Sequence, residues 1–103
     1  MLMTAKFQKL PRSIQDLVKH GIKLTQPSKV ILFGSRARGD CCESSDYDIA
    51  FKNLSHPEKW VEFLVDYDEE PLTLHKVDLL KYEDASAQYR NNIDTDGVVL
   101  YAA

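Results

Sequence analysis

Two short stretches decide the fold of this chain: residues 30–35, VILFGS, and residues 46–51, DYDIAF. The first is a continuous apolar run that stops abruptly at Gly34, which predicts a strand buried on both faces. In the second stretch polar and apolar side chains alternate, as they do in a strand with one buried face. The acidic residues Asp46 and Asp48 then lie together on the face opposite the apolar side chains.

Further elements are predicted on both sides of this pair of strands. Helical periodicity predicts a first helix at 13–26, with Ser13 as its N-cap. A capping-box pattern at 55–58 opens a second helix that buries Trp60, Phe63 and Leu64. The sequence pattern predicts a third strand at residues 74–80 and a final strand at residues 98–101. Between them it predicts a helix that begins near Asp84 and carries Ala85, Tyr89 and Ile93 on one stripe. We therefore expect an α/β (α+β) fold: a small mixed β-sheet with helices packed on one side.

The size and charge of the chain limit what it can do. Its 103 residues and 11.8 kDa predict a single domain over residues 1–103. A net charge of -3 argues against a general nucleic-acid-binding surface, and no apolar run approaches the length that spans a bilayer. The adjacent Cys41 and Cys42 cannot form an ordinary bridge between distant parts of the chain. These features together predict a cytoplasmic protein with reduced cysteines.

The acidic pair on the second strand is the first chemical feature. Asp46 and Asp48 are separated by two strand positions, so their Cα atoms are expected about 6.5 Å apart on one face. Two carboxylates this close repel each other unless a cation lies between them. Mg²⁺ takes oxygen ligands, often one or two carboxylates together with phosphate oxygens of a substrate. The pair is therefore a candidate magnesium site.

The glycine turn after the first strand supplies the complementary feature. Gly34 and Ser35 expose backbone N–H groups, and glycine lets a phosphate approach the main chain. Arg36 and Arg38 bring positive charge to the same segment; they bind phosphate, contact an acidic partner or are simply solvated. A phosphate-binding turn followed by a metal-binding carboxylate pair is the equipment of phosphoryl or nucleotidyl transfer.

Two other phosphate or metal motifs fit less well. Gly34 and Gly39 have the spacing of a P-loop, but Asp40 and Cys41 follow where Lys and Ser or Thr are required. Residues 46–51 begin like an EF-hand loop, yet the third ligand and the glycine are replaced by Ala and Phe. Both motifs are therefore rejected.

The combination of Gly34-Ser35 with Asp46-Tyr47-Asp48 after residues 36–45 resembles the signature of the polymerase-β-like nucleotidyltransferase superfamily, in its minimal (MNT) branch. The resemblance extends over nearly the whole chain. It implies that the Gly-Ser turn holds the β- and γ-phosphates of a nucleoside triphosphate and that the two aspartates hold two Mg²⁺ ions. It also implies a third carboxylate on the next strand, which Asp78 matches best.

The resemblance carries expectations about the reaction and the partner. Proteins of this branch usually act with a HEPN-domain protein, and some transfer AMP from ATP to a tyrosine of that partner as the antitoxin of a toxin–antitoxin pair. These 103 residues leave no room for an extra domain to hold an acceptor, so we expect a partner protein to supply the acceptor contacts. Two alternatives stay open: a non-catalytic module that neutralises its partner by occlusion, and a free-standing enzyme that modifies a small molecule.

Overall fold

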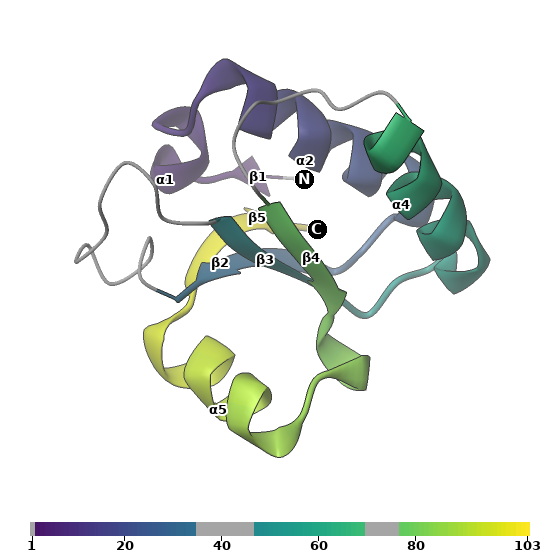
Figure 1. Ribbon diagram of the computed structural model, residues 1–103. Helices are drawn as coiled ribbons and strands as arrows, with labels where there is room; N and C mark the ends of the chain where they lie inside the picture. Colours follow the sequence, from purple (N-terminus) through teal and green to yellow (C-terminus); the bar gives the residue numbers. More distant parts are fainter. Residues whose placement is uncertain (1, 35–46, 70–76) are drawn as a thin grey trace.

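The computed structural model describes residues 2–34, 47–69 and 77–103, which form a mixed sheet with helices on both faces (Figure 1). The strands lie in the order β1-β5-β2-β3-β4, and β4 is parallel to β3 whereas the other neighbouring strands are antiparallel. In chain order the elements are β1 (Leu2–Met3), α1 (Ala5–Gln8), α2 (Arg12–Thr25), β2 (Lys29–Phe33), β3 (Tyr47–Lys52), the 3₁₀ turn η1 (Pro57–Lys59), α4 (Trp60–Glu69), β4 (Val77–Lys81), the 3₁₀ turn η2 (Tyr82–Asp84), α5 (Ala87–Asp96) and β5 (Val98–Ala102).

The main hydrophobic core lies between one face of the sheet and helices α1, α2 and α4. Its centre is an aromatic cluster in which the rings of Phe51, Trp60 and Phe63 lie 5.4–5.7 Å apart between centroids. Helix α2 reaches this cluster at Gly21, where an added Cβ would lie 2.7 Å from the Phe63 ring. The absence of a side chain therefore lets α2 pack directly on the aromatic rings.

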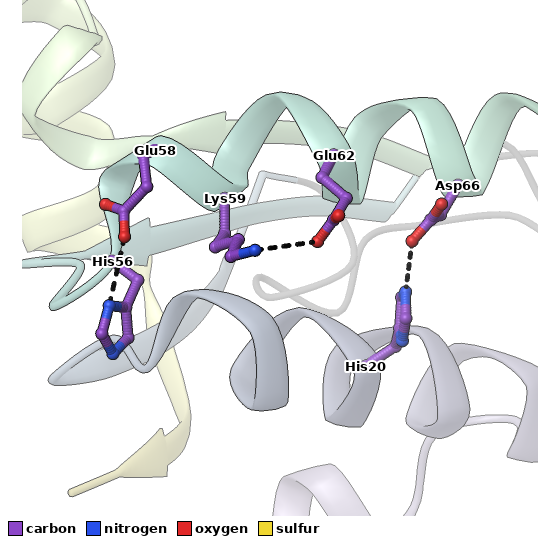
Figure 2. Close-up of polar contacts among 6 residues, drawn as sticks. All are labelled: His20, His56, Glu58, Lys59, Glu62 and Asp66. Carbon is purple, nitrogen blue, oxygen red and sulfur yellow. Dashed lines mark hydrogen bonds and ion pairs between the residues drawn. The ribbon is translucent and has the colours of Figure 1, made fainter.

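Polar contacts at the surface join the helices that cover this core (Figure 2). His20 of α2 lies 3.0 Å from the carboxylate of Asp66 in α4, and its ring also packs on Phe63. A second, local ion pair of 3.8 Å joins Lys59, at the end of η1, to Glu62 in the first turn of α4. These pairs are partly exposed, so they contribute little stability compared with the buried rings beneath them.

The opposite face of the sheet is covered by α5 (Figure 1). The buried residues there are Ile31, Phe33, Ala50 and Ile93, with Leu80 and Tyr82 packed beside them. A hydrogen bond of 2.9 Å from the Tyr82 hydroxyl to Asp94 ties η2 to α5. The second core is thus much smaller than the first.

The predicted fold class is confirmed, with differences in detail. The expectation that helices pack on one side only is wrong, because α5 lies on the other face. The predicted caps also differ. Pro11 rather than Ser13 precedes α2, the 55–58 segment leads into a 3₁₀ turn whose N-cap His56 makes no side-chain capping bond, and Ser86 rather than Asp84 caps α5.

Among the described residues, none of the helices combines the length and apolar character needed to cross a membrane.

Candidate active site

The sheet register brings two of the predicted acidic residues side by side. Asp48 of β3 is paired with Phe33 of β2 on one side and with Asp78 of β4 on the other. Directly paired residues on neighbouring strands point to the same face, and neighbouring strands lie about 5 Å apart. Phe33 belongs to the small core under α5. Both carboxylates therefore lie on the α5 face of the sheet, away from the large core.

Gly34 lies next to this carboxylate pair, and the structure requires glycine there for two reasons. Its φ is +77°, in the left-handed region that residues with a Cβ rarely adopt. A Cβ at this position would also collide with Oδ2 of Asp48. The main chain at the end of β2 thus passes directly beside the Asp48 carboxylate, and a phosphate held by this turn would lie close to both.

These residues line a pocket of about 400 Å³. Gly34, Asp48 and Asp78 lie at the ends of the strands, and Tyr89 and Asn92 of α5 form the facing wall; Phe33 and Leu80 complete the lining. Asp48 is half-buried and Asp78 is exposed. The volume is within the range of small-ligand sites.

The structure brings together three of the residues predicted from the sequence: Gly34, Asp48 and Asp78. The other predicted site residues, Ser35, Arg36, Arg38 and Asp46, lie outside the described residues. The predicted alternation on β3 and β4 is confirmed, because Tyr47 and Val77 are buried in the main core beside the two acidic positions.

Sequence reasoning missed the contribution of α5. The sequence predicted Ala85, Tyr89 and Ile93 on one stripe of this helix. Ala85 precedes α5, and of the other two Ile93 is buried whereas Tyr89 is 53% exposed at the pocket. Asn92 was not singled out at all. Tyr89 and Asn92 are three residues apart, so the sequence shows that they share one face of the helix. It does not show that this helix faces the carboxylates, which is why the two residues could not be assigned to the site.

The donors present suit a divalent metal of the magnesium type. Asp48 and Asp78 supply oxygen ligands from adjacent strands beside an open pocket, which is the hard-ligand set that Mg²⁺ prefers. Within the three described segments, no group of three His, Cys, Asp or Glu side chains gathers as a metal site. The third carboxylate of the predicted set, Asp46, is outside those segments.

The class of protein defined by this fold and site agrees with comparison to known families. Residues 13–103 match the family model of the polymerase beta nucleotidyltransferase domain, and the chain belongs to this family. No curated protein matches it in sequence. The resemblance to nucleotidyltransferases inferred from the Gly-Ser and Asp-x-Asp motifs is thereby confirmed.

Solved structures with the same fold include two toxin–antitoxin assemblies. A toxin–antitoxin crystal structure with AMP-PNP contains a chain 23% identical to this one, with a TM-score of 0.61 and coverage of 89% of this chain and 73% of that one. A mutant of the toxin–antitoxin pair MntA–HpeT gives 21% identity, a TM-score of 0.60 and the same coverage. These likenesses establish the fold.

Proposed function

We propose that this chain is a magnesium-dependent adenylyltransferase that transfers AMP from ATP to a hydroxyl group of a partner protein. The acceptor is a tyrosine of a HEPN-domain protein, and the pair works as an antitoxin and its toxin in the cytoplasm. The observation that carries the proposal is the pairing of Asp48 with Asp78 beside Gly34 in one pocket. The toxin–antitoxin neighbours support the kind of partner.

Each of the site residues predicted from the sequence has a role in this reaction. The turn that begins at Gly34, with Ser35, Arg36 and Arg38, donates N–H and O–H groups to the triphosphate, as a glycine turn can. Asp46, Asp48 and Asp78 would hold two Mg²⁺ ions. When bound, the metal supplies charge for the developing negative phosphate oxygens and lowers the pKa of the attacking hydroxyl.

Asp78 is the carboxylate best placed to meet the acceptor. It is exposed and lies on β4, which pairs with β3 and with no other strand of the described residues. An acceptor can therefore approach from this side of the sheet, where the carboxylate accepts the proton of its hydroxyl. The hydroxyl oxygen forms a bond to the α-phosphorus, the bond to the bridging oxygen breaks, and pyrophosphate leaves.

The direct test is label transfer from ATP labelled at the α-phosphate. The neighbouring open reading frames are first searched for a small all-helical protein, and the chain is then incubated with Mg²⁺ and that candidate partner. We expect labelled partner with the wild-type chain, loss of the label with EDTA, and loss with Asp48→Ala. The control is Asp16→Ala, which removes an acidic side chain that is 48% exposed and pairs with Arg12 on α2. Transfer at the wild-type rate by Asp48→Ala would contradict the proposed mechanism.

A second assay separates catalysis from simple occlusion. The double variant Asp46→Ala/Asp48→Ala is co-expressed with the partner, and growth is measured. If the proposal is right, the double variant binds the partner but no longer protects the cells. Full protection would show that binding alone is sufficient. Label transfer to a small molecule without any partner would instead point to a free-standing enzyme.

A further inference from the structure

The wall of the pocket opposite the carboxylates comes from α5. Tyr89 and Asn92 are three residues apart and both line the pocket that contains Gly34, Asp48 and Asp78. Residues at this spacing lie on the same face of a helix. Neither side chain has a part in metal binding or phosphate binding as described above. Their place in the pocket therefore calls for a separate explanation.

The Tyr89 ring is held at the pocket but is not packed away. Its centroid lies 6.5 Å from that of Phe33, and more than half of the side chain is exposed. Tyr82, on the same side of the sheet, is engaged differently: its hydroxyl donates to Asp94 and its ring lies under the Lys52 ammonium group. No described residue hydrogen-bonds the Tyr89 hydroxyl. An exposed aromatic ring beside a pocket offers a flat apolar surface for stacking.

Asn92 adds a polar group one helical turn away. Its side chain is half-buried, and no described residue forms a hydrogen bond with its amide group. An asparagine amide presents one acceptor and a donor side by side. Adenine shows a matching donor and acceptor at N6 and N7, whereas guanine presents two acceptors at the same edge. The amide is therefore suited to an adenine rather than a guanine base.

We infer that Tyr89 and Asn92 form the base-binding wall of the site, with the Tyr89 ring stacked on the adenine and the Asn92 amide hydrogen-bonded to its edge. This inference rests on the proposed function, because it assumes that the triphosphate occupies the Gly34 turn. It assigns to α5 the selection of the nucleotide, while strands β2, β3 and β4 position the reacting phosphates.

The test compares ligands with and without a base. Binding of a non-hydrolysable ATP analogue, the matching GTP analogue and inorganic tripolyphosphate, each with Mg²⁺, is measured by calorimetry. For Tyr89→Ala we expect about 5- to 100-fold weaker binding of the ATP analogue, as for loss of base stacking, with unchanged tripolyphosphate binding. Tyr89→Phe keeps the ring and should bind the ATP analogue within about twofold of the wild type.

Asn92→Ala should reduce the preference for the ATP over the GTP analogue. The matched control is Gln88→Ala, which changes an exposed residue of the same helix outside the pocket and should leave all three affinities unchanged. Circular dichroism of each variant checks that α5 is intact.

The outcomes separate this inference from the proposed function. Equal weakening of the ATP analogue and tripolyphosphate by Tyr89→Ala would overturn the base-binding role. Wild-type protein that binds tripolyphosphate as tightly as the ATP analogue would overturn it too, and would leave the triphosphate site standing. Wild-type protein that binds neither ligand would contradict the proposed function as well.

Discussion

The two faces of the sheet are built for different purposes. The face under α1, α2 and α4 buries sixteen of the described residues in one continuous core, among them the rings of Phe51, Trp60 and Phe63. The face under α5 buries four described residues, and beyond them it opens into the pocket with Asp48 and Asp78. Because apolar burial is the main source of folding stability, the first face can stabilise the strands while the second keeps polar groups accessible.

This division explains how carboxylates can lie within strands of the sheet. Asp48 is flanked along β3 by Tyr47 and Ile49, which anchor the strand in the large core. Its own side chain points to the opposite face, so ionised oxygens are not buried among the aromatic rings. We call the face under α1, α2 and α4 the packed face and the face under α5, which carries Asp48 and Asp78, the reactive face. Packing on the first fixes the strands that carry the carboxylates of the second. Substitutions on the packed face should therefore change stability, and substitutions on the reactive face should change activity.

The largest effect is expected from emptying the centre of the packed face. Phe63 is fully buried and contacts both other rings of the aromatic cluster. Phe63→Ala should lower the free energy of unfolding by about 3–5 kcal/mol, through lost burial and the cavity left behind. Urea denaturation followed by circular dichroism measures this. Val61→Ala, at a position that is 66% exposed on the same helix, should change stability by less than about 0.5 kcal/mol.

The second prediction concerns the reactive face. Asp78→Asn removes the charge of a proposed metal ligand at an exposed position and should lower the rate of the proposed transfer by about 100-fold or more, with an unfolding transition close to that of the wild type. The matched control is Asp84→Asn, which removes a carboxylate that pairs with Lys81 outside the pocket. A large loss of stability in Asp78→Asn would contradict the separation of stability and activity between the two faces. A comparable loss of activity in Asp84→Asn would contradict the specific role of Asp78.

Gly34→Ala should affect both properties moderately. The substitution places a Cβ at φ +77° and against the Asp48 carboxylate. We expect a cost of about 1–3 kcal/mol in stability and weaker binding of tripolyphosphate, since either the turn or Asp48 must move. Thermal unfolding and calorimetry measure the two effects. Gly21→Ala, on the packed face, should reduce stability without changing the affinity for tripolyphosphate once the protein is folded.

The smallest effect is expected at the link between η2 and α5. The hydrogen bond to Asp94 raises the pKa of Tyr82 in the folded chain, with a smaller contribution from desolvation. A group with a raised folded pKa contributes stability below its unfolded pKa, about 10 for tyrosine, and loses that contribution as pH rises through the folded value. The wild type should therefore show a small fall in melting temperature as the pH rises above about 10, and Tyr82→Phe should abolish this fall. Identical pH profiles for wild type and variant would show that the bond does not stabilise the attachment of α5.

Local pattern was enough to predict some features because they depend on near neighbours along the chain. Alternation along β3 and β4 predicted that Asp48 and Asp78 point away from the core, since a strand turns its side chains to opposite faces at every residue. The apolar spacing from Ile14 to Ile22 likewise predicted the buried side of α2. The caps were predicted less well, because several polar residues near each helix start compete for the same role.

The sequence by itself determined which face each strand side chain points to, the glycine at position 34 and the membership of the nucleotidyltransferase family. All three depend on the spacing of residues that are near one another along the chain. Tertiary structure alone decided that β4 lies parallel to β3 with Asp78 opposite Asp48, and that α5 crosses to the other face and brings Tyr89 and Asn92 over the carboxylates. The physical reason is that strand order and helix placement follow from the burial of apolar surfaces that are far apart along the chain. The α5 helix is only weakly amphipathic, so its own sequence gives little indication of which face of the sheet it covers.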